Sequence, residues 1–242
     1  MGFTTYAAAL SFLAAVASAE TVSVTPHDSY SSSVGVLGCK IDTNRVAYWP
    51  GAVDCNNFCI RLSHEGRSLN ILRIDTSGGA HDVSYDTWNM LVTGKSATEE
   101  PTAGGGVDMD YEVLDPSECA DLFHTDGNKM PLSGANSMGF LAECLNQPDS
   151  WVANNYVLYN IVDPVCHWGY NEVCDLDWPA ANQATCPHQL GSTVALTDQP
   201  VYDIKYPFGE VVVASTGEVA NSAAAATAAK PKSKRAFRRF YA

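Results

Sequence analysis

Apolar and polar residues alternate along several short segments, as they do in strands buried on one face. Turn-forming residues separate these segments, which favours a mainly β chain. The clearest alternation has Val107, Met109, Tyr111 and Val113 facing inward between acidic residues. Strands are predicted at residues 46–49, 55–62, 69–74, 106–113 and 155–162, with one or two more within 201–214.

The strongest helix signal follows a Gly-Gly turn after the strand at 69–74. The turn is expected to expose Asp75 and Asp82, because glycine tolerates the positive φ that sharp turns need. Ser84 suits an N-cap and Gly94 a helix C-terminus. Residues at three-residue spacing form the expected buried face of this helix: Tyr85, Trp88 and Leu91. Further helical structure is predicted from Asp115 and near residues 137–145.

Residues 1–19 have the pattern of a secretory signal peptide. An apolar stretch at 7–16 precedes Ala17-Ser18-Ala19, which fits the small-residue cleavage rule. A buried N-terminal helix is the alternative interpretation. Nothing after residue 20 approaches the roughly 18 apolar residues of a membrane span. The chain is therefore predicted to be secreted and extracellular, with no transmembrane segment.

Eight cysteines follow the predicted signal peptide. An even number in a secreted chain indicates four disulfides, although eight cysteines allow 105 pairings. The alternative is zinc bound by Cys55, Cys59 and the Cys186-Pro187-His188 segment. No paired Cys-x-x-Cys motif occurs, and secreted thiols oxidise, so neither a metal nor a cofactor is predicted. The predicted disulfide cysteines are Cys39, Cys55, Cys59, Cys119, Cys144, Cys166, Cys174 and Cys186.

Charge is distributed unevenly along the chain. Of 14 lysines and arginines, six lie within residues 230–242, which leaves eight against 27 acidic residues and a net charge of −19 for the rest. An acidic body disfavours contact with nucleic acid. The six basic residues near the end are Lys230, Lys232, Lys234, Arg235, Arg238 and Arg239.

This basic tail has three interpretations. The first is a solvated end that is clipped after Lys234-Arg235. The second is a nuclear localisation signal, and the third is a binding segment for acidic lipids. A secretion signal and a nuclear signal fit together in a protein that one organism exports and another takes up.

The order of several motifs resembles a known architecture. Val46-Ala47-Tyr48-Trp49, the strand that ends at Asp75, the segment 81–91 and the strand 105–113 follow one another. This succession is similar to the six-stranded double-psi β-barrel of barwin, expansins (and the related RlpA-like domains) and family 45 endoglucanases. The resemblance implies a mainly β fold: such a barrel with short helices and a disulfide-stapled C-terminal extension.

The resemblance also divides the chain. The expected parts are a signal peptide (1–19), a polar lead-in (20–33), the barrel-like core (34–120), a cysteine-stabilised extension packed on it (121–218) and a disordered alanine-rich and basic tail (219–242).

The resemblance implies candidate catalytic residues. The family's His-Phe-Asp motif has its carboxylate where Asp82 lies, but the histidine is displaced by one, to His81. The endoglucanase general base would follow Tyr48-Trp49, where this chain has Pro50. Inverting hydrolysis needs two carboxylates about 6.5–9.5 Å apart. Asp54 or Asp75 would have to replace the missing one, and a lytic reaction would use Asp82 alone.

Six residues are candidates for ligand binding. The aromatic ones either stack on sugar rings or form core, and the aspartates either line a cleft or accept backbone hydrogen bonds in a turn. The histidine either forms an acid–base pair with the neighbouring aspartate or is an exposed loop residue. The candidates are Tyr48, Trp49, Asp75, His81, Asp82 and Trp88.

The layout of signal peptide, disulfide-bonded body and basic tail resembles small secreted effectors of plant-associated fungi. It implies a monomeric, non-enzymatic virulence protein that alters host immunity and reaches the host nucleus through its tail. The partner would be a host protein or a cell-wall glycan. Two alternatives stay open: a polysaccharide-binding or -cleaving protein of expansin or endoglucanase type, and an apoplastic barwin-like binder or inhibitor.

Overall fold

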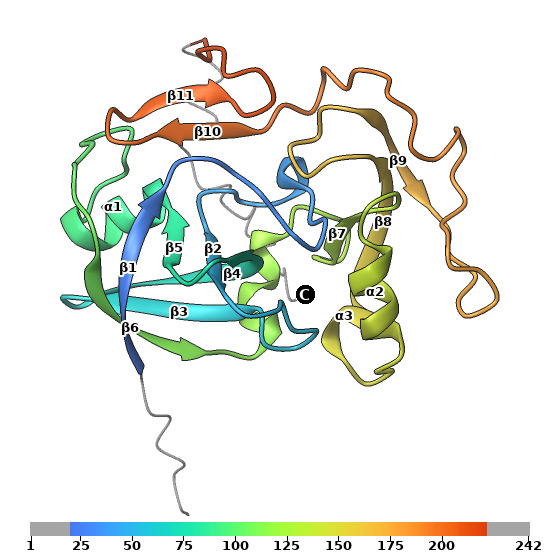
Figure 1. Cartoon of the computed structure of the whole chain (residues 1–242), viewed down its shortest axis with the longest axis horizontal. Coiled ribbons are helices and arrows are strands. Elements are labelled where there is room, and N and C mark those ends of the chain that lie inside the picture. Colours follow the sequence, from blue (N-terminus) through green and yellow to red (C-terminus); the bar gives the residue numbers. More distant parts are fainter. Residues whose placement is uncertain (1–19, 222–242) are drawn as a thin grey trace, which may run out of the picture.

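The computed structural model describes residues 20–221 and contains a closed six-stranded β-barrel (Figure 1). Around the barrel the strands follow the order β1-β5-β2-β4-β3-β6. The predicted mainly β class with a six-stranded barrel is therefore confirmed. The strands are β1 (Glu20–His27), β2 (Val46–Pro50), β3 (Cys59–His64), β4 (Arg67–Ser77), β5 (His81–Ser84) and β6 (Val107–Val113).

Two strands of the barrel are each inserted between strands that follow one another in the chain. β2 lies between β4 and β5, parallel to the first and antiparallel to the second. β1 lies between β5 and β6, parallel to β5 and antiparallel to β6. This double interleaving is the double-psi arrangement. Residues 20–27, expected as polar lead-in, thus supply a barrel strand, because β1 closes the sheet between β5 and β6.

The barrel interior is filled by residues from all six strands, including Val24, Trp49, Leu62, Ile71, Val83 and Met109. The same cluster also includes Tyr85, Trp88 and Leu91 of the helix that follows β5, and Ile204 and Val211. Within β6, however, Val113 is 50% exposed rather than inward-facing, because it lies at the strand's end.

Helix α1 (Tyr85–Thr93) confirms the strongest helix prediction. Its three expected apolar residues are buried, and Gly94 ends it with φ of +84°. Ser84 stands at the N-cap position, but its hydroxyl donates to the carbonyl of Asn44 at 2.5 Å instead of capping the helix. The segment before the helix, residues 81–84, is a strand that pairs with β1 and β2.

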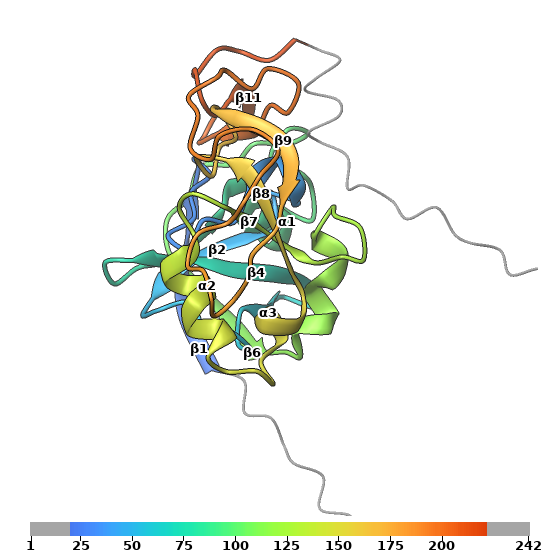
Figure 2. The ribbon, with the colours of Figure 1, turned by 90° about the vertical axis from the view of Figure 1, so that its right-hand side faces the viewer.

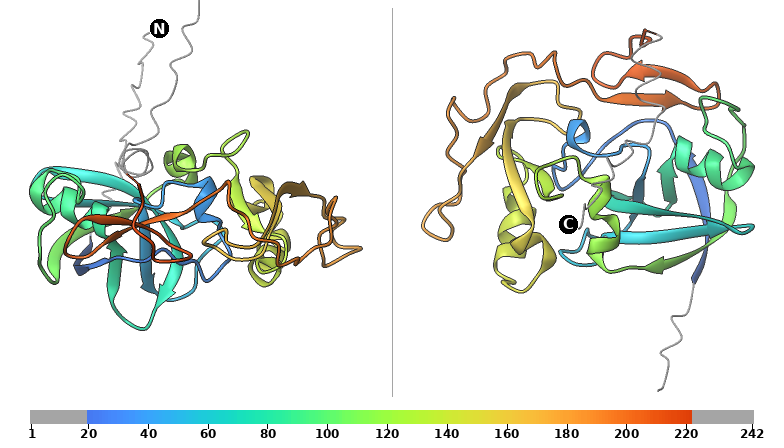
Figure 3. Two further views of the ribbon diagram at one scale, coloured as in Figure 1. Left: turned by 90° about the horizontal axis from the view of Figure 1, so that it is seen from above. Right: turned by 180° about the vertical axis from the view of Figure 1, so that it is seen from behind.

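Most of the rest of the chain lies beside the barrel, and the last two strands run over its upper end as drawn in Figures 1 and 2; Figure 3 gives two further views. A three-stranded sheet has the order β7-β8-β9, and a separate hairpin is formed by β10 and β11. Within the described residues, no helix is long and apolar enough to cross a bilayer. The elements are the 3₁₀ turns η1 (Gly38–Lys40) and η2 (Pro116–Leu122), strands β7 (Met130–Ser133), β8 (Tyr156–Ile161), β9 (Gly169–Cys174), β10 (Tyr202–Lys205) and β11 (Glu210–Val213), and helices α2 (Met138–Leu145) and α3 (Trp151–Asn154).

A second apolar cluster joins the extension to the barrel. Outward-facing residues of β2 and β4, among them Val46, Leu72 and Ile74, pack with Leu132 and Leu158 of the extension sheet. The two parts therefore share a core. The domain boundaries expected from the sequence stay a prediction.

All eight cysteines pair, which confirms four disulfides. Two of these bonds connect the barrel part with the extension, and one lies wholly within the extension. Residues 1–19 and 222–242 lie outside the described residues, so the signal peptide and the nuclear localisation residues stay predictions. The pairs are Cys39–Cys166, Cys55–Cys144, Cys59–Cys119 and Cys174–Cys186.

Candidate functional site

Asp75 is not exposed by the glycine turn, as the sequence suggested, but is 8% exposed. Its carboxylate accepts hydrogen bonds from Ser33 N at 2.9 Å, Thr76 N at 2.7 Å and the Ser31 hydroxyl at 2.5 Å. The segment that follows β1 therefore crosses over this carboxylate. The expectation was wrong because the segment that covers Asp75 lies more than 40 residues earlier in the chain. The residues of the turn do not reveal that contact.

Asp82 lies in the same polar row as Asp75, with Tyr48 between them. Tyr48 is paired with Asp75 across β2 and β4, and with Asp82 across β2 and β5. The carboxylate of Asp82 accepts a hydrogen bond from the hydroxyl of Thr25 on β1. Burial, together with the nearby carboxylate of Asp203, raises the pKa of Tyr48 well above its usual value. Both aspartates of the row thus accept hydrogen bonds from neighbouring segments of the chain.

His81 does not form an acid–base pair with Asp82. Successive strand residues point to opposite faces, and His81 meets the edge of the Trp49 ring at a centroid distance of 4.8 Å. Trp49 is only 3% exposed and Trp88 only 1%. The indole N–H of Trp88 donates to Val24 O at 3.1 Å. Neither ring exposes a face on which a sugar could stack. Of the two interpretations, stacking on a sugar or packing in the core, both tryptophans therefore have the second.

The β10–β11 hairpin packs on the segment that follows β1, next to Tyr48. Tyr30 N donates to Asp203 Oδ1 at 2.8 Å, and Lys205 Nζ lies 3.0 Å from Asp28 Oδ2. The cavity left beneath the hairpin, next to Tyr48, has about 20 Å³, room for roughly one water molecule. This cavity is lined by Tyr48 but by neither Asp75 nor Asp82, and it is too small for a sugar ring.

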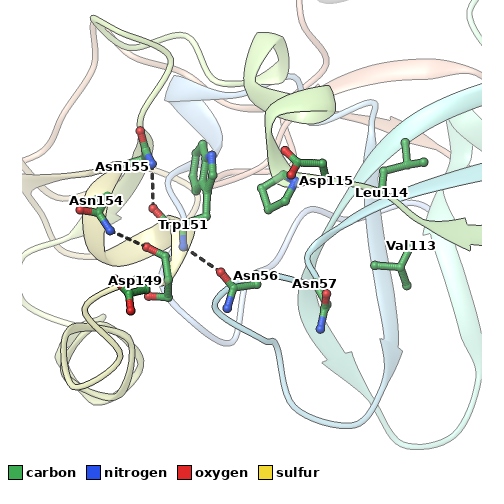
Figure 4. Close-up of a pocket in the computed structure, with 11 residues that line it drawn as sticks. Asn56, Asn57, Val113, Leu114, Asp115, Asp149, Trp151, Asn154 and Asn155 are labelled. Carbon is green, nitrogen blue, oxygen red and sulfur yellow. Dashed lines mark hydrogen bonds between the residues drawn. The ribbon is translucent and has the colours of Figure 1, made fainter.

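A wide groove opens elsewhere, where the barrel meets the extension (Figure 4). Its volume is about 680 Å³, within the roughly 300–1,000 Å³ of small-molecule sites. One wall comes from the loop before β3 and the end of β6, and the other from α3 and the loop before it. The lining residues are Asn56, Asn57, Val113, Leu114, Asp115, Pro116, Asp149, Ser150, Trp151, Asn154 and Asn155.

The two walls of this groove are tied together. The Cys55–Cys144 disulfide lies next to it, and Trp151 N donates to Asn56 Oδ1 at 2.8 Å. On the extension side, the Asn154 amide donates to Pro148 O at 2.8 Å, and the Asn155 amide to Trp151 O at 2.9 Å. Asn56, Asn154 and Asn155 are thus held in place before any ligand arrives.

Trp151 is half-buried at the centre of the groove. Its ring stacks on Phe123 at 5.8 Å and meets the edge of Phe58 at 5.1 Å. Hydrogen bonds from the Ser117 hydroxyl and backbone N–H lower the pKa of Asp115, which keeps this carboxylate ionised. No three His, Cys, Asp or Glu side chains within residues 20–221 converge as a metal site requires.

Sequence reasoning missed the groove residues. The Asn56-Asn57 and Asn154-Asn155 pairs are visible in the sequence, but almost 100 residues separate them. Only the Cys55–Cys144 pairing would have brought them together, and the sequence does not select among the 105 possible connectivities.

Comparison with known proteins gives little further guidance. No family model matches the chain, and no curated protein matches it. Crystal structures of cerato-platanin 3 and cerato-platanin 2 from M. perniciosa align with it at 13% and 17% identity. Each alignment covers 41% of this chain and 98% of the other, with a TM-score of 0.31. That score is too low to assign fold or function, so the fold rests on this chain's own strand order.

Proposed function

We propose that this chain is a secreted effector-type protein, a disulfide-stabilised binding module that acts on a host component without catalysis. The observation that carries the proposal is the state of the two predicted carboxylates. Asp75 is 8% exposed and accepts three internal hydrogen bonds, and the half-buried Asp82 accepts one from Thr25.

Glycoside hydrolysis needs a carboxylate pair that receives both a sugar and a water molecule. Asp75 is buried and bonded to Ser31, Ser33 and Thr76, so it does not offer the second carboxylate to a substrate. We infer that Asp75 and Asp82 hold strands together. This favours the binding functions over the endoglucanase-like alternative.

The extracellular location and the route into the host are part of the proposal. Four disulfides suit an oxidising compartment, and residues 1–19 supply the export signal. The six basic residues within 230–242 would direct the protein to the host nucleus after uptake. Their positive charge is opposite in sign to the acidic body.

The first experiment separates binding from catalysis. Purified secreted protein is incubated with cellulose and with chitin, and both pelleted protein and released reducing sugar are measured. Asp82→Asn is compared with Asp110→Asn, a matched control in which another β1 threonine, Thr21, donates to a barrel aspartate. We expect no sugar release from any of the three. Sugar released by the wild type and the control but not by Asp82→Asn would overturn the proposal.

The second experiment tests the action on the host. The protein is infiltrated into leaves, and the oxidative burst after an immune elicitor is measured with and without residues 230–242. We expect the complete protein to change the burst. Fluorescent fusions of the same two forms should differ in nuclear signal. An unchanged burst would contradict the effector function, and equal nuclear signal would remove the role of the tail.

A further inference from the structure

We infer that the groove between barrel and extension is a binding site for a neutral oligosaccharide, centred on Trp151. The inference rests on the proposed binding function and names the site and the ligand class. It moves the site away from Asp75 and Asp82, to the other side of the shared core. Four observations carry it: hydrogen-bonding chemistry, the aromatic surface, charge and rigidity.

The polar lining of the groove matches sugar hydroxyls. An asparagine amide offers both donors and an acceptor, and an ionised carboxylate accepts only. Sugar hydroxyls do both, so amides next to carboxylates can pair with adjacent hydroxyls of one ring. In the described part of the chain, the exposed side chains of Asn57 and Asp149 have no hydrogen-bond partner. They remain available to a ligand.

Trp151 gives the groove an apolar surface beside these polar groups. Phe58 and Phe123 hold the indole in place, so its exposed part needs no ordering on binding. Figure 4 shows this ring between Asn154 and Asn155 on one side and Asp115 on the other. The C–H face of a sugar ring packs on such a surface while its hydroxyls reach the amides and carboxylates.

Charge narrows the ligand class. The lining residues include two carboxylates, Asp115 and Asp149, and no lysine, arginine or histidine. Asp115 is ionised because its pKa is lowered by Ser117. Phosphates, nucleic acids and uronic acid polymers would therefore be repelled, also by the acidic body as a whole. A neutral oligosaccharide meets no such repulsion.

Rigidity favours binding at this place. The Asn56–Trp151 hydrogen bond and the Cys55–Cys144 disulfide connect the two walls. A preorganised site loses little side-chain freedom when it binds, which improves affinity. A groove of about 680 Å³ accommodates more than one sugar ring at a time.

The test is calorimetric titration of the disulfide-bonded protein with cellohexaose, chitohexaose and, as the anionic control, pentagalacturonate. We expect at least one neutral hexamer to bind and the anionic one not to. Trp151→Ala should weaken binding about tenfold or more, compared with Trp168→Ala, a half-exposed extension tryptophan outside the groove.

Because Trp151 also packs on two phenylalanines, a second variant keeps the test independent of folding. Asn57→Ala combined with Asp149→Ala removes only exposed side chains and should weaken binding about tenfold, as the loss of one or two hydrogen bonds does. The matched control is Asn182→Ala combined with Asp177→Ala, exposed residues of the same types outside the groove. Binding that is equal in both double variants would overturn the site.

Other outcomes identify which part fails. No binding of either neutral hexamer, while the leaf response persists, overturns the ligand class and leaves the proposed function intact. Binding of spermidine that disappears at high salt, with no hexamer binding, would assign the groove to a cationic ligand and also overturn the inference. Loss of the leaf response alone would count against the effector function and not against the groove.

Discussion

Tyr48 lies directly across the β2–β5 pairing from Asp82, and both side chains belong to a row that Thr25 and Asp75 extend. Burial and the neighbouring carboxylates keep the phenol protonated, since the pKa of Tyr48 is well above its usual value. A row of this kind joins four barrel strands through polar contacts. Its two aspartates already accept hydrogen bonds from other parts of the chain. We therefore infer that the groove between barrel and extension is the better binding site.

The buried pair of Arg45 and Asp86 is expected to matter strongly for stability. Their side chains are 13% and 5% exposed and 2.9 Å apart, and Asp86 also accepts from Ser96 and Ala97. Asp86→Ala would leave the guanidinium buried without its partner. We expect a loss of about 3–5 kcal/mol in the free energy of unfolding, measured by urea denaturation.

The control for this pair is the exposed pair of Lys95 and Glu100, with side chains 58% and 55% exposed. Solvent screens it, so Lys95→Ala should leave the urea midpoint unchanged. Equal destabilisation by the two substitutions would contradict the importance of burial.

Disulfides should contribute according to the loops that they close. Cys55–Cys144 spans 89 residues and Cys174–Cys186 spans 12. Loop-closure entropy assigns them about 4.5 and about 3 kcal/mol. Replacing each pair by alanines and measuring unfolding should therefore show the larger loss for Cys55–Cys144. The reverse order would indicate that the unfolded chain retains structure around the long loop.

The hairpin contact should make stability depend on pH through Asp203. Burial raises its pKa and outweighs the Tyr30 N–H and the charges of Lys205 and His27 that oppose the shift. The native state therefore keeps a proton that the unfolded chain releases above about pH 4. Stability falls as the pH rises through this window. Asp203→Asn keeps an oxygen for Tyr30 and should remove that fall, measured as unfolding free energies from pH 3.5 to 7.

Asp28, in the same contact, should act with the opposite sign. Burial would raise its pKa, but Lys205 and the Tyr206 N–H outweigh it and leave the pKa below its usual value. Its contribution is present above about pH 4 and is lost as the pH falls through the lowered pKa. Asp28→Asn should therefore destabilise at pH 7 and have progressively less effect as the pH falls below about 4. Identical pH profiles of the two variants would contradict both assignments.

Docking of the hairpin should depend on Gly209. Its φ is +70°, and a Cβ there would lie 2.3 Å from Ala97 O. Gly217 has a similar φ of +73° but open space around it. Gly217→Ala should cost about 1–2 kcal/mol for backbone strain alone, and Gly209→Ala clearly more. Faster tryptic cleavage after Lys205 in Gly209→Ala only would locate the effect in the hairpin.

Local patterns were sufficient for much of the fold. Alternation in residues 106–113, the spacing of Tyr85, Trp88 and Leu91, and the glycine at 94 predicted β6 and α1, because these signals arise from neighbours in the chain. The first barrel strand was missed, since residues 20–27 look like a polar segment. Their strand role depends on pairing with β5 and β6, which lie far away in sequence.

The sequence by itself determined that the chain is a mainly β, cysteine-paired, acidic protein with a strand–turn–helix unit at 69–93. These properties follow from composition and short-range periodicity. Only the tertiary structure decided that Asp75 is buried and that Asn56 lies against Trp151 across 95 positions. The physical reason is that burial and groove formation depend on which distant segments cover each other, and chain closure through disulfides selects those segments.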